Sequence, residues 1–267
     1  VGVHIPKLNT GSLSKLHLQA RLQFAGRQQE SPIFELLNQQ QGSRGFQRMP
    51  AAVEGDLFFD MEGNPLEEGG LEYLFGLYLD EQGKQVFKAF WAHSRRAEKK
   101  AFEDFIDFVM AHLQRYPHAH IYHYASYEET AIKRLMTQHG TREAQVDWLL
   151  RNGKLIDLYK VVREALRVSE PSYSIKYIEH FYMERRAGEV TNAGASIVFY
   201  ERWKSTQEAD LLEKIERYNE DDVRSTYLLR NWLLSIKPQQ LHVEHESEQV
   251  PEVSQVASEQ EQRLAIY

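Results

Sequence analysis

Strand-type patterning dominates the chain between residues 55 and 91. Residues 55–62, 71–79 and 85–91 are rich in β-branched and aromatic side chains, which is the composition typical of strands. Residues 80–84 (DEQGK) separate the last two stretches and have the composition of a hairpin turn. The pattern therefore predicts three consecutive strands that form an antiparallel meander.

Helical periodicity follows the meander. Residues 95–115 place apolar side chains three and four positions apart among charged ones, which predicts an amphipathic helix that ends before Pro117. Residues 121–124 predict a short strand and residues 126–139 a second helix. Strand and helix patterns therefore alternate from this point on.

The rest of the central region continues this alternation. Residues 154–159, which follow Gly153, predict another strand, and helical patterns fill most of residues 159–235. The order of elements predicts an α/β fold with a mixed central sheet, in which a three-strand antiparallel meander is joined by parallel strands and helices flank the sheet.

The two ends of the chain differ from this central region. Residues 12–26 have helical spacing, with Ser12 or Ser14 as N-cap, and predict a helix packed on an upstream region. Residues 38–50 are aperiodic and rich in Gln, Gly and Arg, as linkers are. The helical pattern stops before Pro238, and the Glu, Gln and Ser that follow have little to bury.

These changes predict three regions. Residues 1–50 are a helical remnant of an upstream region plus a linker, residues 51–237 are the main domain, and residues 238–267 are a flexible acidic tail. The first residue is Val1 and not Met, which suggests a fragment of a longer protein.

Composition narrows the class of protein. Of the 267 residues, 42% are hydrophobic and 27% are charged, which excludes a fully disordered or collagen-like chain. There is no cysteine, so disulfide scaffolds, thiolate metal sites and cysteine nucleophiles are excluded together. No apolar run approaches the roughly 20 residues that cross a bilayer, and no secretory signal is recognisable. We therefore expect no membrane partner and a cytoplasmic location.

Charge is unevenly distributed. The net charge is −7, but residues 1–50 contain six Lys or Arg against two Glu, whereas residues 238–267 contain six Glu against one Arg. The region between them is acidic overall. A broad basic surface is therefore not expected, although an enzyme that binds cations and has a few local basic groups remains compatible with the composition.

Two carboxylates are expected together at the end of the first strand. Residues two apart on a strand share a face, so Phe58, Asp60 and Glu62 point to one side. The strand-breaking residues 63–65 (GNP) would leave both carboxylates at an open sheet edge. The alternative is a strand that turns polar as it leaves the core.

A further carboxylate lies on the apolar face of the predicted final helix, residues 207–235. Steps of three and four positions along that face reach Asp222, and Tyr218 lies one turn earlier. A buried carboxylate must be paired, protonated or bound to a metal. The alternative role for Tyr218 and Asp222 is a hydrogen bond between helix and sheet.

The segment YHYASYEE, residues 122–129, runs from a strand into a helix. Ser126 and Glu129 have the spacing of a capping box, which assigns Glu129 a local role. Glu128 has no such role, and compensation of the helix dipole is its alternative explanation. It is therefore a fourth candidate acid.

The order of a strand D-x-E, an acid at a strand-to-helix junction and a helical Y-x-x-x-D resembles the tyrosine-bearing branch of the DEDD exonuclease superfamily, which has the ribonuclease H fold. Residues 55–235 more closely resemble the YprB-type ribonuclease H-like domain of predicted RecB-family nucleases. The motifs that carry this resemblance are GDLFFDMEGNP, YHYASYEETAIKRL, LIDLYKVVR, PSYSIKYIEHFY and YNEDDVRSTYLLRNWLL. It implies that residues 51–237 are an exonuclease domain, with RecB-like or helicase domains covalently linked in the full-length protein.

The resemblance implies a metal-dependent 3′–5′ exonuclease that hydrolyses phosphodiester bonds of single-stranded DNA or RNA with two ions. Oxygen ligands without His or Cys suit Mg²⁺ or Mn²⁺. By the resemblance, Asp60 would bridge both ions, Glu62 and Asp222 would complete the site of the attacking water, and Glu128 would support the second ion. Tyr218 would orient that water or help to deprotonate it.

One departure from the family pattern keeps other functions open. The second motif usually has Asp, whereas Tyr127 is here followed by Glu128. The alternatives are a catalytically weak domain that binds nucleic acid within a larger nuclease or helicase protein, and a structural domain whose acids pair internally. Asp157 is a reserve ligand, or else a hydrogen-bonded acid at a strand end.

Basic and aromatic residues supply candidate substrate contacts. Lys176, Lys133 and Arg134 are expected to meet phosphates, and Tyr124 or Tyr173 to stack on a base. The alternative for the charged residues is a solvated helix face.

Overall fold

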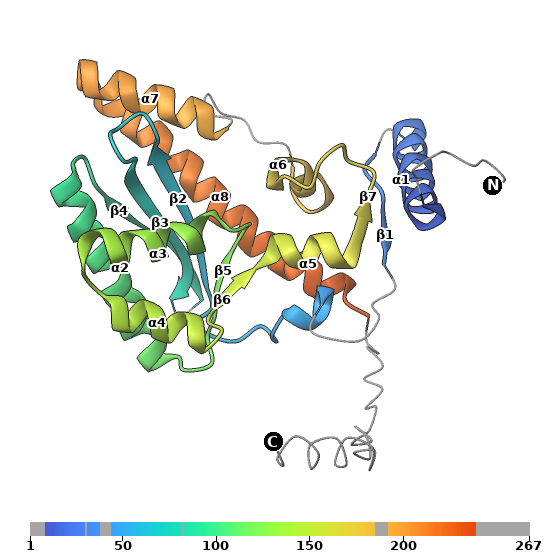
Figure 1. Cartoon of the computed structure of the whole chain (residues 1–267), viewed down its shortest axis with the longest axis horizontal. Helices are drawn as coiled ribbons and strands as arrows, with labels where there is room; N and C mark the ends of the chain where they lie inside the picture. The colour runs from blue at the N-terminus through green and yellow to red at the C-terminus, as the bar shows by residue number, and fades with distance from the viewer. Residues whose placement is uncertain (1–8, 30, 38–43, 82, 185–191, 239–267) are drawn as a thin grey trace, which may run out of the picture. The chain divides into compact units, whose positions relative to one another are not determined.

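The computed structural model describes residues 9–29, 31–37, 44–81, 83–184 and 192–238. Within them a five-stranded sheet has the order β4-β3-β2-β5-β6 (Figure 1). The strands are β2 (Leu57–Asn64), β3 (Leu71–Glu81), β4 (Lys84–Trp91), β5 (Ile121–His123) and β6 (Leu155–Asp157). Strands β2, β3 and β4 form an antiparallel meander, while β5 pairs parallel with both β2 and β6. The predicted α/β fold with a mixed central sheet is confirmed.

Helices flank both faces of the sheet (Figure 1). The first face packs against α2, α3 and α4, and its core includes Leu57, Phe59 and Met61 of β2. The second face packs against α7 and α8. The bounds are α2 (Arg95–Arg115), α3 (Tyr127–His139), α4 (Glu143–Arg151), α7 (Ala193–Thr206) and α8 (Ala209–Ile236).

Strand β2 is central and buried, and its alternation sorts its residues between the two helical layers. Leu57, Phe59 and Met61 join the core under α2 and α3, so the intervening Phe58, Asp60 and Glu62 point toward α8. Polar side chains are thereby directed into the layer between sheet and helix.

The connection between β6 and α7 contains short elements that the sequence patterns do not predict individually. They are α5 (Leu158–Ala165), β7 (Leu166–Val168), α6 (Ile175–Ile178) and a 3-10 helix, η2 (Glu179–Phe181). The predicted strand at residues 154–159 is shorter than expected, because Asp157 caps α5 by accepting a hydrogen bond from the backbone N–H of Tyr159 at 2.9 Å.

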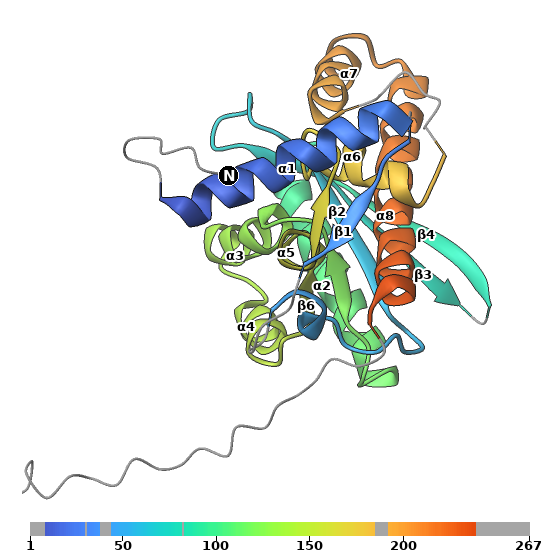
Figure 2. The same ribbon diagram turned by 90° about the vertical axis from the view of Figure 1, so that its right-hand side faces the viewer.

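The N-terminal helix, α1 (Thr10–Gln29), lies alongside a second, two-stranded sheet (Figure 2). That sheet pairs β1 (Phe34–Leu36) with β7 in antiparallel orientation. Gly26 permits the close approach, since a Cβ at this position would lie 2.7 Å from the Cβ of Ser169. The helix therefore packs on β7 and on the residue that follows it.

Helix α1 also begins earlier than predicted. The side chain of Asn9 accepts a hydrogen bond from the backbone N–H of Ser12 at 2.7 Å, so the predicted cap at Ser12 or Ser14 is wrong.

Part of the predicted linker at residues 38–50 is packed. Residues 38–43 lie outside the described residues, but residues 45–48 form a 3-10 helix, η1 (Gly45–Arg48), in which Phe46 is buried. Glu164 accepts hydrogen bonds from the backbone N–H of Gly45 and from Nε of Arg48, both at 2.7 Å.

The predicted acidic tail falls almost wholly outside the described residues. Among the helices that are described, none combines the length and apolar character needed to cross a membrane.

Candidate metal centre

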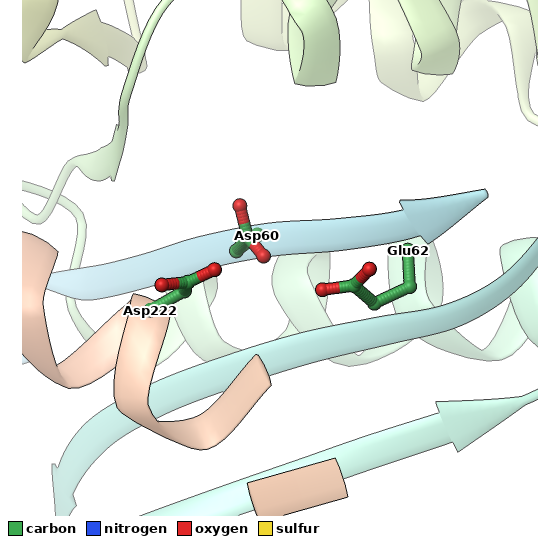
Figure 3. A group of neighbouring side chains, drawn as sticks. All are labelled: Asp60, Glu62 and Asp222. Atoms are coloured by element: carbon green, nitrogen blue, oxygen red, sulfur yellow. The ribbon is translucent and has the colours of Figure 1, made fainter. Parts of the chain in front are cut away.

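Three carboxylates converge between the sheet and α8. Asp60 and Glu62 come from β2 and Asp222 comes from α8, and one ligand oxygen from each lies within 4.8 Å of the others (Figure 3). Asp60 is partly exposed, whereas Glu62 and Asp222 are 4% and 8% exposed. Residues far apart in the sequence thus form one acidic cluster.

Local structure explains this convergence. Strand alternation places Asp60 and Glu62 on the same side of β2, and the register shifts between Glu62 and Gly63. Helix α8 packs against β2 with the face that carries Tyr218 and Asp222, both of which are buried. The two predicted pairs of residues therefore face each other across the interface between β2 and α8. One pair is Asp60 and Glu62, and the other is Tyr218 and Asp222.

The cluster is electrostatically unfavourable without a cation. Burial, followed by the charges of Asp222, Glu128 and Glu62, raises the pKa of Asp60 well above its ordinary range. Burial and the charge of Asp222 raise the pKa of Glu62 to about 8. Carboxylates held in this way retain protons near neutral pH unless a cation compensates their charge. Such a set of oxygen ligands suits a hard divalent cation.

Asn219 holds Asp60 in place, and the sequence analysis missed it. Its Nδ2 donates a hydrogen bond to Oδ2 of Asp60 at 2.8 Å, and its side chain is fully buried. It packs against the backbone of Gly76 on β3, where a Cβ would lie 1.7 Å from Oδ1 of Asn219. Two signals were available: Asn219 lies three positions before Asp222 on the same helix, and Gly76 interrupts a strand of large residues.

Lys176 lies inside the acidic cluster. Its Nζ forms an ion pair and hydrogen bond with Oδ1 of Asp222, and it lies 4.6 Å from the ring centroid of Tyr218. Lys176 was predicted to contact a phosphate. Its position on α6 places its ammonium group beside the carboxylates instead.

The phenol of Tyr218 faces the same carboxylates. Burial, followed by the charges of Asp222, Glu62 and Asp60, raises the pKa of Tyr218, so the phenol is protonated at neutral pH. In the protein without a bound cation, the protonated phenol can donate a hydrogen bond.

Glu128 is buried in the first turn of α3 but is not a member of the three-residue cluster. Its Oε2 lies 3.5 Å from Nδ1 of His123 and has no hydrogen-bond partner among the described residues. Its charge nevertheless contributes to the raised pKa of Asp60. A buried carboxylate oxygen without a donor is an atom that a bound cation would satisfy.

The predicted capping box is wrong. Ser126 precedes α3 as expected, but its side chain makes no capping hydrogen bond. Glu129 forms an ion pair with Lys133 instead.

The remaining candidates have partners within the protein. Arg134 forms an ion pair with Glu72, and Lys133 is paired as described above. The hydroxyl of Tyr124 donates to the carbonyl oxygen of Tyr173. Asp157 accepts from the backbone N–H of Ala125 at 3.0 Å as well as capping α5, so it has the structural role that was its alternative reading.

A family model described as the RNase_H superfamily matches residues 57–234. That span contains every element of the central sheet and all four of the predicted acidic ligands. No curated protein and no solved structure gives a significant match to the chain.

Proposed function

The chain belongs to the ribonuclease H superfamily, and from that premise we propose that it is a metal-dependent 3′–5′ exonuclease that acts on single-stranded DNA or RNA. The observation that supports this function most strongly is the convergence of Asp60, Glu62 and Asp222 from β2 and α8. The 3′–5′ direction and the tyrosine-bearing, YprB-type subclass rest on the resemblance of the sequence motifs.

Each acidic residue has a proposed role at the metal centre. Asp60, Glu62 and Asp222 would hold Mg²⁺ or Mn²⁺, and Glu128 would contribute its unpartnered oxygen to a second ion. Bound divalent cations would lower the pKa of the attacking water and stabilise the leaving oxygen. Asn219 would keep the Asp60 carboxylate oriented, since a hydrogen bond to a metal ligand fixes its geometry.

Tyr218 and Lys176 would position the reactants. The protonated phenol of Tyr218 would donate a hydrogen bond and orient the attacking water. Lys176 pairs with Asp222 in the protein alone. Once cations neutralise the carboxylates, its ammonium group would pair with the scissile phosphate instead.

A test uses 5′-labelled single strands of DNA and RNA with Mg²⁺ or Mn²⁺. We expect the wild-type protein to shorten them stepwise from the 3′ end. Asp60→Asn and Asp222→Asn should each lower the rate by roughly 100-fold or more, which is the effect of removing one transition-state stabilising group. Glu220→Gln, an exposed change on the same helix, should keep the wild-type rate. Internal cleavage would identify an endonuclease and contradict the proposal.

A second candidate is a nucleic-acid-binding domain without efficient cleavage. It is favoured by the position of Glu128 outside the three-residue cluster and by the pairing of Lys176 with Asp222. Binding of labelled strands without any shortening, in either cation, would support this function over the exonuclease.

The resemblance also underlies the remaining proposals on organisation. We infer a cytoplasmic protein in which residues 1–50 and 238–267 flank the exonuclease domain of residues 51–237. RecB-like or helicase domains in the same polypeptide would supply its substrate as single strands.

A further inference from the structure

A polar groove runs beside α1, outside the acidic cluster. It consists of two adjoining cavities of about 550 and 580 Å³ that share Gln23 of α1 with Glu170 and Pro171, which follow β7. We call this feature the α1 groove. Arg27 lines the first cavity, and Arg163 of α5 lines the second.

Two cations of the α1 groove have no acidic partner. Arg27 and Arg163 are exposed and form no ion pair among the described residues. In contrast, the three basic residues that were predicted to contact phosphates all pair with carboxylates. They are Lys133, Arg134 and Lys176. The one acid that lines both cavities, Glu170, lies 3.5 Å from Nδ1 of His180. Among the described residues, the groove is therefore lined by two arginines that form no ion pair.

Aromatic rings accompany the cations. Tyr159 and Tyr173 line the second cavity and are both partly exposed. The guanidinium of Arg163 lies 4.7 Å from the ring centroid of Tyr173. Cations interleaved with aromatic faces are the combination that holds single-stranded nucleic acid, because phosphates bind the charges and bases stack on the rings.

The wall of the groove is joined along the chain to a residue that contacts the acidic cluster. Tyr173 and Ser174 line the second cavity, and α6 begins at the next residue and places Lys176 on Asp222. The same wall is joined to the end of β5, since Tyr124 donates a hydrogen bond to the carbonyl oxygen of Tyr173. Residues 173–176 therefore link the second cavity to the acidic cluster.

We propose that the α1 groove binds the single-stranded segment that trails from the acidic cluster. Arg27 and Arg163 contact its phosphates, and Tyr159 and Tyr173 stack on its bases. This inference rests on the proposed function and deepens it by naming the substrate path. Helix α1, which forms one wall of the groove, lies outside the span matched by the family model.

The experiment measures equilibrium binding of fluorescent single strands of 12 and 3 nucleotides, as DNA and as RNA, to the full chain in EDTA so that no cleavage occurs. The double variant Arg27→Ala/Arg163→Ala should weaken binding of the 12-mer by about 10-fold or more and that of the trimer by less. The slope of log K against log salt should fall by about 1.4, because each phosphate contact with a single strand contributes about 0.7.

The matched control is Arg96→Ala/Lys99→Ala. These two residues are also exposed and form no ion pair among the described residues, but they lie on α2, which packs on the opposite face of the sheet from α8. The control should bind both strands as the wild type does. An equal loss in both double variants would show a bulk charge effect and overturn the proposal, as would an unchanged affinity in the groove variant. Thermal unfolding of each variant checks that it is folded.

The outcomes separate the groove from the nuclease. If the wild type shortens the strands but the groove variant binds them as the wild type does, the exonuclease proposal holds and the groove proposal is wrong. If the groove variant binds more weakly and the wild type does not shorten the strands, the groove proposal holds and the exonuclease proposal is wrong. A wild-type protein that binds neither DNA nor RNA would overturn the groove proposal.

Discussion

At the residue scale, Glu62 shows how burial and like charge act together. It is 4% exposed on β2, and burial and Asp222 raise its pKa from 4.5 to about 8. Hydrogen bonds from Ser196 and Asn219 lower the pKa but do not offset these two effects. In the absence of a metal, the folded state therefore favours the protonated form of Glu62.

This shift predicts a pH-dependent stability. A group with a raised folded pKa contributes stability that is fully present below its unfolded pKa of 4.5 and is lost as the pH rises through about 8. In EDTA, the free energy of unfolding should fall between pH 5 and pH 8.5 by a few kcal/mol. Chemical denaturation at the two pH values measures this change.

Glu62→Gln is the informative variant, because it keeps the shape of the side chain and cannot ionise. Without metal it should be more stable than the wild type at pH 8.5 and nearly equal to it at pH 5. A variant that is less stable at pH 8.5 would show that the carboxylate is already compensated by other groups.

At the element scale, the contact between α8 and β3 depends on a missing side chain. Gly76 faces α8 and lies opposite Asp60 in the register of β2 and β3. Asn219 occupies the space above it and reaches Asp60 from there. The helix can approach the sheet closely at this point because glycine has no Cβ.

Gly76→Ala should therefore act on the metal centre through Asn219. The new Cβ would collide with the side chain of Asn219, so we expect a loss of about 1–3 kcal/mol in stability from overpacking. Displacing Asn219 from Asp60 should also weaken Mn²⁺ binding by about 10- to 100-fold, and Asn219→Ala alone should do the same. Urea denaturation and calorimetric titration measure the two effects.

The double variant Gly76→Ala/Asn219→Ala tests the coupling. Removing the asparagine makes room for the methyl group, so stability should recover relative to Gly76→Ala while Mn²⁺ affinity stays low. Losses in affinity that add up in the double variant would mean that the two residues act independently.

At the scale of the whole molecule, the metal centre links the start and the end of the domain. Asp60 and Glu62 lie in the first strand of the meander, and Asp222 lies in the last helix. A cation bound by all three would connect β2 to α8 and bind only the folded state. Metal binding should therefore stabilise the entire domain.

Thermal unfolding with and without Mn²⁺ tests this linkage. At a concentration about 100 times Kd the stabilisation should be about 2.7 kcal/mol, which corresponds to a rise in Tm of roughly 5–10 °C. Asp222→Asn should lose most of the rise, and Glu220→Gln should keep it. The same rise in Asp222→Asn would place the cation elsewhere.

Local periodicity made part of the site predictable. Alternation along a strand placed Asp60 and Glu62 on one face, and steps of three and four placed Tyr218 with Asp222, because both relations depend only on residues near in sequence. The meander and helices α2, α3 and α8 were predicted for the same reason, whereas α4 was not predicted. The strands β1 and β7, with three residues each, are too short to carry a recognisable period.

The sequence by itself determined which residues share a face, which of the longer elements form, and that acids occupy positions where apolar residues belong. Only the tertiary structure decided which faces meet: Asn219 over Gly76, Lys176 on Asp222, and α1 against the residues after β7. These contacts join residues that are distant along the chain, and their partners follow from the order of strands and the packing of helices. Periodicity specifies the face of one element and leaves its neighbour undefined.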